Sequence, residues 1–322
     1  MTSRRKIVWL NLSILGILLA VAIVVYAAMQ GPLGARVYAR TLREGSPAER
    51  LKAATALESF GASGRPAVPL LLEILQNPND RAAPACARAL REIDPQAAYE
   101  YVTSLAERKP SLSPTVIDVF GNLGPIAWRA IPLVRTALGR SEHIRQLLPA
   151  LIDMGDYSDE LIAAIVADSR DSAYSVKKWD AMLAFDRLSD LGARIRPDVE
   201  RLTSDSTPAV SGQAKMILAK IADQPSYPLS GLRGFPGQMQ TYQEYALDRL
   251  SKQARAAEAL PDILTELHSK SVLIRFMAAW TLMHIGSTVR STLPQLHALE
   301  ADPNSLVRDG AADAIHTIEA SR

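Results

Sequence analysis

A nine-residue pattern of small and apolar positions recurs along the chain from about residue 50 to its carboxyl end. It reads AATALESFG at 53–61, CARALREID at 86–94 and AAWTLMHIG at 278–286. The apolar residues of each copy fall at i, i+3, i+4 and i+7, which is one face of an α-helix. Each copy therefore predicts an amphipathic helix that packs against other helices.

Looser copies of the same pattern fill the rest of this stretch. They lie at 116–124, 147–155, 184–192, 214–222 and 311–319, with the weakest at 246–251. Successive copies end about 29 to 37 residues apart, a period near 32. Periods of this size are typical of solenoids built from helical hairpins.

A second amphipathic segment follows most copies, for example RPAVPLLLEIL at 65–75, PIAWRAIPLVRTAL at 125–138 and STVRSTLPQLHAL at 287–299. Proline near the start of such a segment is compatible with a helix, because the first-turn amides have no intrahelical partner. A glycine such as Gly61 or Gly286 between the two segments fits a left-handed helix C-cap. Each unit is therefore predicted to be a helix, a tight turn and a second helix.

The first thirty residues differ from this repeated part. From 7 to 29 only Asn11 and Ser13 are polar, and no residue is charged. A helix of this length crosses the roughly 30 Å hydrocarbon core of a bilayer. We expect a basic flank at 1–6, a transmembrane helix at 7–29 and a juxtamembrane segment at 30–45. A cleaved signal peptide is the alternative, although its apolar core usually runs only about 7–15 residues.

Charge on either side of the apolar run predicts its orientation. Residues 4–6 are all basic, and positive flanks favour the cytoplasmic side of a membrane. Arg36, Arg40 and Arg43 follow on the other side and make the asymmetry slight. The sequence favours a single-pass protein of a bacterial inner membrane with its repeats on the non-cytoplasmic side, and the opposite orientation stays open.

One segment interrupts the repeats. Residues 223–240 contain three prolines and three glycines, so we expect a loop between the repeat regions 46–222 and 241–322. The loop carries Tyr227, Leu232, Arg233 and Phe235. Two interpretations remain: the loop covers a groove of the protein itself, or it docks a partner.

Composition narrows the function. The chain is 48% hydrophobic and 6% aromatic with a net charge of +2, and no long basic block is present, so nucleic-acid binding is not expected. Cys86 is the single cysteine, which excludes an intramolecular disulfide, and we expect a buried, inert thiol. Trp128, Trp179 and Trp280 lie on apolar helix faces and are expected in the core.

The sequence contains none of the usual catalytic or phosphate-binding motifs. No histidine lies three or four residues from another, so a helical metal-binding pair is not expected. His284 and His316 could approach each other from successive hairpins, but the pattern supplies no acidic third ligand. We expect a non-enzymatic protein without a cofactor or metal.

Three segments carry a resemblance to a known family. IRFMAAWTLMHIG at 274–286, VRDGAADAIHTIE at 307–319 and ERLKAATALESFG at 49–61 resemble HEAT repeats of the short bacterial type, more closely than tetratricopeptide repeats. The resemblance implies an all-α, armadillo-like solenoid of about nine hairpins, added to the transmembrane helix.

The same resemblance implies a ladder of polar contacts between repeats, in which an arginine is paired with a polar residue six positions earlier. The pairs would be Asp302 with Arg308, Ser269 with Arg275, and Glu44 with Arg50. Ser211 and Ala83 stand where two further arginines would be, so a ladder broken in the middle is expected.

The function expected from these features is that of a membrane-anchored scaffold. A solenoid offers a long concave face, lined by the second helices, to which a protein partner binds. Two alternatives stay open: an accessory or chaperone-type subunit of an enzyme, as some lyase-related HEAT-like proteins are, and a homo-oligomeric structural protein. Fold resemblance alone does not carry an activity across.

Overall fold

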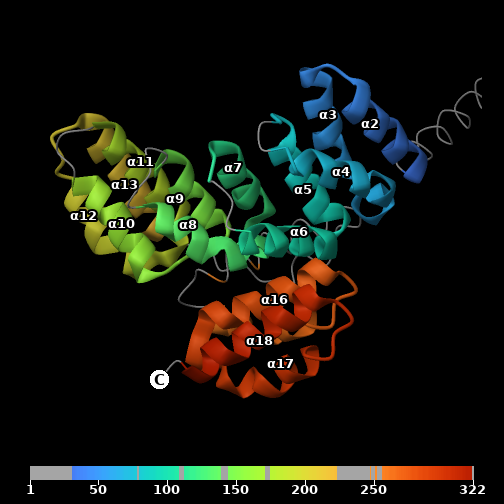
Figure 1. Cartoon of the computed structure of the whole chain (residues 1–322). Coiled ribbons are helices and arrows are strands. Elements are labelled where there is room, and N and C mark those ends of the chain that lie inside the picture. Colours follow the sequence, from blue (N-terminus) through green and yellow to red (C-terminus); the bar gives the residue numbers. More distant parts are fainter. Residues whose placement is uncertain are drawn as a thin grey trace, which may run out of the picture. The chain divides into compact units, whose positions relative to one another are not determined.

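The computed structural model of the protein describes residues 31–77, 80–108, 112–138, 144–170, 175–222 and 256–320, together with Leu247 and Ser251. Every regular element among them is an α-helix or a 3-10 helix (Figure 1). The chain forms two compact units, Met1–Ala98 and Tyr99–Arg322. The expected transmembrane helix at 7–29 and the expected loop at 223–240 lie outside the described residues.

The first unit is built from hairpins in which short side chains allow close helix packing. Its elements are α2 (Pro32–Glu44), α3 (Pro47–Glu58), η1 (Gly61–Ala67), α4 (Val68–Leu75) and α5 (Ala83–Ile93), and α6 (Pro95–Glu107) begins at its end. The segment for which the sequence suggested only a membrane-proximal connection is therefore mostly helix α2. It packs on α3 and η1, and its Ala35 and Leu42 are buried.

The second unit is also built from alternating first and second helices of hairpins. Its elements are α7 (Pro114–Leu123), η2 (Gly124–Ala130), α8 (Ile131–Leu138), α9 (Ile144–Asp153), α10 (Asp159–Arg170), α11 (Ser175–Arg187), η3 (Ser189–Arg194), α12 (Arg196–Leu202), α13 (Pro208–Ala222), η5 (Ala256–Ala259), α15 (Leu260–Glu266), α16 (Val272–Ile285), η6 (Gly286–Thr292), α17 (Leu293–Leu299) and α18 (Ser305–Ala320). The first helices of successive hairpins pack on one another: α7 on α9, α9 on α11, α11 on α13, and α16 on α18.

Most second helices are divided, where the sequence predicted one continuous helix. A 3-10 turn comes first and an α-helix follows, as in η1 with α4, η2 with α8 and η6 with α17. A proline stands at the second position of the α-helical part in each case: Pro69, Pro132 and Pro294. Proline has no amide hydrogen and its ring blocks the carbonyl four residues earlier, so the α-helix starts anew there.

Glycines at the end of the first helices have positive φ, at Gly61, Gly124, Gly155, Gly192 and Gly286. The expected left-handed conformation has ψ near +47°. Gly124 and Gly286 instead have ψ of −144° and −147°, close to a region that only glycine populates readily. These corners therefore require glycine more strictly than an ordinary C-cap, where asparagine is tolerated.

One stretch of the described residues, Val272–Leu299, is long and apolar enough to cross a membrane by length and composition, with a mean hydropathy of 1.3. Just over half of its apolar window is buried inside the protein. The structure also divides the stretch into α16, η6 and α17, with the break at Gly286. Core helices pass the same test of length and composition, and we assign this stretch to the core of the second unit.

Candidate functional site

Three ion pairs link neighbouring hairpins in the same way. A cation in one first helix binds the aspartate just before the next first helix: Arg50 with Asp80 at 2.5 Å, Lys178 with Asp205 at 2.8 Å, and Arg275 with Asp302 at 2.7 Å. The partners are 30, 27 and 27 positions apart. We call these three pairs the hairpin ladder.

Each ladder aspartate also accepts a hydrogen bond from the backbone amide two residues later. The donors to Asp80, Asp205 and Asp302 are the amides of Ala82, Thr207 and Asn304, at 2.9, 2.8 and 2.9 Å. Each carboxylate therefore shapes the turn that starts its own hairpin while it binds the cation of the preceding one. The turn and the contact between hairpins depend on the same side chain.

The ladder differs in detail from the pairs that the HEAT resemblance implied. The Asp302 carboxylate binds Arg275 of the preceding hairpin, whereas Arg308 donates to the Asp302 backbone carbonyl at 2.7 Å. The Arg275 guanidinium donates a hydrogen bond to the backbone carbonyl of Ser269 at 2.8 Å. Glu44 pairs with Arg40, and Arg50 donates to the carbonyl of Leu42 in addition to Asp80.

The middle pair of the ladder uses a lysine, where the HEAT pattern predicts an arginine. The Lys178 ammonium binds Asp205, and both side chains are largely buried. The HEAT pattern places an arginine six residues after a polar residue of the same hairpin. The cation instead belongs to the preceding hairpin, and its spacing of 27–30 residues before each turn aspartate is the sequence signal for the pair.

Hydrogen bonds with cations shift the pKa of two ladder aspartates. At Asp302, burial acts to raise the pKa, but hydrogen bonds from Arg275 and from Asn304 outweigh it and the pKa is lowered. At Asp205 the hydrogen bond from Lys178 is the main cause of a lowered pKa. Both carboxylates are therefore ionised at neutral pH, as an ion pair requires.

A second set of contacts joins residues far apart in the chain of the second unit. The Trp128 ring stacks on Tyr99 at 5.1 Å and on Phe276 at 5.1 Å, and it lies 6.0 Å from Trp280. These four side chains form what we call the aromatic cluster. They come from α6, η2 and α16, so the cluster holds the carboxyl-terminal helices against the start of the unit.

Polar contacts with α18 fix the edges of the aromatic cluster. The Trp128 Nε1–H donates to Asp313 at 2.8 Å, and the Tyr99 hydroxyl donates to Asp309 at 2.5 Å. Burial, followed by this hydrogen bond, raises the pKa of Tyr99 to about 12, so the hydroxyl keeps its proton. Arg129 lies 3.8 and 3.7 Å from the two carboxylates and balances part of their charge.

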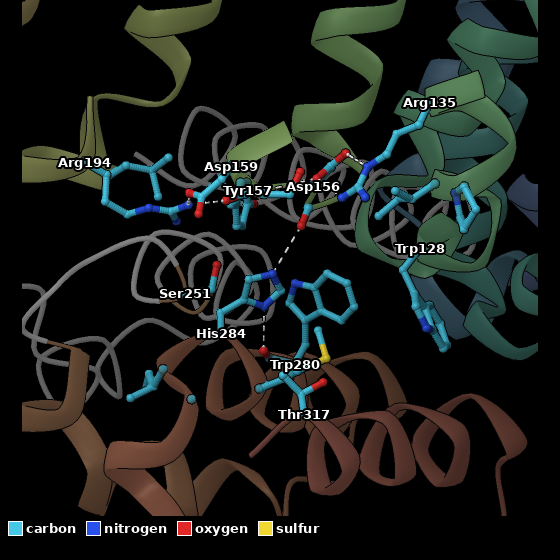
Figure 2. Close-up of a pocket in the computed structure, with 18 of the residues that line it drawn as sticks. Trp128, Arg135, Asp156, Tyr157, Asp159, Arg194, Ser251, Trp280, His284 and Thr317 are labelled. Carbon is cyan, nitrogen blue, oxygen red and sulfur yellow. Dashed lines mark hydrogen bonds and ion pairs between the residues drawn. The ribbon is translucent and has the colours of Figure 1, made fainter. Parts of the chain in front are cut away.

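A cavity of about 1030 Å³ opens beside the aromatic cluster. Trp128, Tyr157, Trp280 and His284 contribute rings to its lining, and Arg135 and Arg194 contribute guanidinium groups (Figure 2). The volume is at the upper end of the range for small-molecule sites.

The charged side chains of the cavity pair with one another. Arg135 binds both oxygens of Asp156, at 2.6 and 2.5 Å. Arg194 binds Asp159 at 2.7 Å and the carbonyl of Tyr157 at 2.8 Å. Two cations and two anions cancel, so these four residues do not give the cavity a net charge that would select a charged ligand.

His284 is held by backbone atoms. Its Nδ1 lies 3.0 Å from the Trp280 carbonyl and its Nε2 lies 3.2 Å from the Gly155 carbonyl (Figure 2). Carbonyl oxygens only accept hydrogen bonds, so a neutral imidazole donates to one of them and an imidazolium to both. The ring links α16 to the turn after α9 and is not placed as a metal ligand would be.

Trp280 packs directly against that turn. A side-chain carbon added at Gly155 would lie 2.5 Å from the Trp280 ring, and Gly155 has a φ of +85°. The indole Nε1 of Trp280 is buried and has no hydrogen-bond partner among the described residues. The Trp280 ring therefore packs closely on Gly155 while the indole N–H group makes no hydrogen bond with the described residues.

The remaining candidate residues are placed as follows. Trp128 and Trp280 are buried as expected, whereas Trp179 is 37% exposed and is not a core residue. Cys86 is buried, and burial raises its pKa to about 12, so the thiolate form is absent at neutral pH. His316 is exposed on α18. No group of three or more potential metal ligands occurs in the described part of the chain.

The cavity brings together residues that sequence reasoning did not connect. Arg135, Asp156 and Tyr157 carry no repeated pattern. The sequence predicts Trp128 and Trp280 only as core residues. Because the contacts between them span about 150 positions (Trp128 to Phe276 and Trp280), no local signal in the sequence marks them as partners. The expected docking residues Tyr227, Leu232, Arg233 and Phe235 lie outside the described residues.

Comparisons with known proteins leave the family open. No protein-family model matches the chain, and no curated protein matches it. One matching solved structure is the crystal structure of an engineered protein, 18% identical, with 89% of this chain and 96% of that chain covered. The TM-score of that match is 0.22, a level at which whole folds do not superpose.

Proposed function

We propose that this protein is a membrane-anchored, non-enzymatic scaffold of HEAT-like helical hairpins that binds a protein partner through the face formed by the second helices. The hairpin ladder is the observation that carries the proposal. The same cation–aspartate contact recurs at Arg50, Lys178 and Arg275 with spacings of 30, 27 and 27 residues. A repeated connection between modules is typical of proteins that bind over an extended surface.

The pairing of charges in the cavity also favours binding over catalysis. A catalytic acid or base needs a side chain that can reach a substrate with a proton to give or accept. Arg135, Asp156, Arg194 and Asp159 are engaged with each other, and both nitrogens of His284 face backbone carbonyls. These residues hold the hairpins together, which is a structural use of charged groups.

The apolar run at 7–29 supplies the membrane anchor in this proposal. An anchored scaffold meets its partner within the membrane plane, where the effective concentration of both is higher than in bulk solution. The proposal therefore predicts a partner that is itself a membrane protein or is held at the membrane surface.

Photo-crosslinking from defined positions tests the proposal in intact membranes of cells that express the full chain. A photoreactive residue is placed at exposed positions on second helices, at Glu73, Glu200 and Gln295. Met216, 61% exposed on first helix α13, is the matched control. We expect one heterologous protein, identified by mass spectrometry, to be crosslinked from the second helices and not from Met216.

Other results distinguish the alternatives. Crosslinks only to further copies of the chain would overturn the proposal in favour of a homo-oligomeric structural protein. Crosslinks equally strong from Met216 would show that the second helices do not form the binding face. Release of the full chain from membranes by alkaline carbonate would contradict the anchor.

A further inference from the structure

Helix α2 presents an exposed face that combines apolar and basic side chains. Leu33 and Val37 are 56% and 45% exposed, although both are large hydrophobic residues. Arg36, Arg40 and Arg43 are exposed on the same helix. Positions 33, 36, 37, 40 and 43 follow helical spacing, so the five side chains share one face. We call it the α2 outer face.

The opposite side of α2 secures the helix to its unit. Gly34, Ala35 and Leu42 are buried, and Tyr38 packs edge-to-face on Phe60 with ring centroids 5.6 Å apart. Packing within the unit therefore uses the inner side of the helix. Nothing in that packing explains why the outer face carries Leu33 and Val37.

The α2 outer face is positively charged. Arg40 pairs with Glu44 at 2.9 Å, whereas Arg36 and Arg43 have no ion-pair partner among the residues that the structure describes. Two unpaired guanidinium groups beside exposed aliphatic side chains match the chemistry of an anionic bilayer surface. The aliphatic groups enter the acyl boundary while the arginines bind lipid phosphates.

The position of α2 in the chain points to the same partner. The apolar run ends at Met29, and α2 begins at Pro32. Gly31 is extended, with a φ of −105° and a ψ of −166°, and Pro32 opens the helix. Because an extended glycine followed by proline separates α2 from what precedes it, α2 can take a direction different from that of a membrane-crossing helix.

We propose that α2 lies in the plane of the membrane interface, with Leu33 and Val37 inserted and Arg36 and Arg43 bound to anionic lipid headgroups. This inference rests on the membrane anchor of the proposed function. It adds that the first unit is docked on the bilayer and not held away from it. The first unit therefore has a fixed orientation relative to the membrane surface.

If α2 pointed away from the bilayer, its carboxyl-terminal end would lie at a different depth from its start. With a rise of about 1.5 Å per residue, the 13 residues of α2 are about 20 Å long. A helix that points away from the bilayer leaves only Leu33 near the lipid. A helix that lies in the interface keeps Leu33, Val37 and Glu44 at a similar depth.

Depth-dependent quenching distinguishes the two geometries. The full chain, with Cys86→Ala to remove its single thiol, receives one cysteine at a time: Leu33→Cys, Val37→Cys, Glu44→Cys or Met216→Cys as the distant exposed control. Each is labelled with an environment-sensitive fluorophore and reconstituted into vesicles of phosphatidylcholine and phosphatidylglycerol that contain brominated lipid. We expect similar quenching at 33, 37 and 44, and several-fold less at 216.

A charge variant isolates the part of the arginines. Arg36→Gln with Arg43→Gln should reduce the quenching at position 44 several-fold. In vesicles of phosphatidylcholine alone, the quenching at position 44 should fall to the same extent in the chain that keeps both arginines. Equal quenching at position 44 in both kinds of vesicle and in the charge variant would overturn the assignment of anionic lipid as the partner.

Flotation of the same samples tests the membrane anchor independently of the orientation of α2. If the chain floats with the vesicles but the label at Glu44→Cys is quenched no more than the label at Met216→Cys, then α2 points away from the membrane and this inference is wrong while the anchor stands. If the chain does not float with vesicles of either composition, the anchor itself is wrong.

Discussion

The hairpin ladder and the aromatic cluster hold helices together in opposite ways. The ladder uses single charged pairs between neighbouring hairpins, as in Arg275 with Asp302. The aromatic cluster uses large rings from segments about 150 residues apart, as in Trp128 with Phe276 and Trp280. The ladder recurs three times among the described residues, and the cluster has no second copy there.

The difference follows from what each contact has to do. At three junctions between neighbouring hairpins the same cation–aspartate pair recurs at a spacing of 27 to 30 residues, so one small, directional interaction is reused. The carboxyl-terminal helices meet the start of the second unit only once, without a repeated geometry. Large rings bury much apolar area and tolerate varied packing angles, which suits a contact of this kind.

The cluster also modifies the simplest solenoid picture. In a stack of repeats each unit contacts only its neighbours. In the second unit, Tyr99 on α6 reaches Asp309 on α18, which is 210 positions away. The solenoid is therefore an interpretation of the repeated hairpins, to which the structure adds contacts that repetition does not predict.

The largest effect is expected from removal of a ring of the aromatic cluster. Trp280 is 2% exposed, and Trp280→Ala should lower the free energy of unfolding by about 4 kcal/mol, the usual cost of emptying a buried tryptophan site. Urea denaturation of the full chain in detergent, followed by helical circular dichroism, measures it. Trp179→Ala, at a 37% exposed position, should cost less than about 1 kcal/mol. Equal losses would mean that the cluster is not a principal contact.

Removal of a ladder cation should have the next largest effect. Arg275→Ala leaves the Asp302 carboxylate, whose side chain is 6% exposed, without its partner, and the expected loss is about 3 kcal/mol. Arg40→Ala breaks the exposed pair with Glu44 and should cost no more than about 0.5 kcal/mol. The same denaturation measurement compares them, and a loss from Arg275→Ala as small as that control would remove the ladder from the stabilising contacts.

The glycine corners allow a matched comparison between contact with the Trp280 ring and backbone strain alone. Gly155→Ala and Gly61→Ala both strain a positive φ, but only at Gly155 does the new carbon collide with a ring, that of Trp280. We expect Gly155→Ala to be the more destabilising by about 2 kcal/mol, the typical cost of overpacking. A thermal melt of each variant measures the difference, and identical melting temperatures would contradict the close approach of Trp280 to the corner.

The smallest expected effect is a dependence of stability on pH that comes from the ladder. The folded-state pKa of Asp302 is below its ordinary value of 3.8. Its contribution to stability is therefore present above that value and is lost as the pH falls toward the folded-state pKa. In acid titrations of stability, Asp302→Asn should show a shallower loss below about pH 4. Arg275→Gln should flatten the same region, and an unchanged slope in that variant would exclude Arg275 as the cause.

The sequence predicts more of the hairpin ladder than of the aromatic cluster. The repeat predicts Asp302, Arg275 and Arg50 as ladder residues, because repetition makes each position comparable with its counterparts. It predicts no pair for Asp80 or Asp205. The HEAT resemblance pairs Asp302 with Arg308 of its own hairpin, whereas the cation that binds the Asp302 carboxylate is Arg275 of the preceding hairpin. Which of two nearby arginines a carboxylate reaches depends on how the hairpins stack.

The amino-acid sequence by itself determined the all-helical hairpins, most of their boundaries and the glycine corners, because helical periodicity, proline and glycine act over a few residues. Only the tertiary structure decided that Trp128 meets Phe276 and Trp280, that Gly155 supports the Trp280 ring, and that Lys178 continues the ladder. Those contacts join residues separated by 27 to about 150 positions, and apolar burial can be satisfied by many partners. The choice among them is made by packing of the whole unit, which no local pattern encodes.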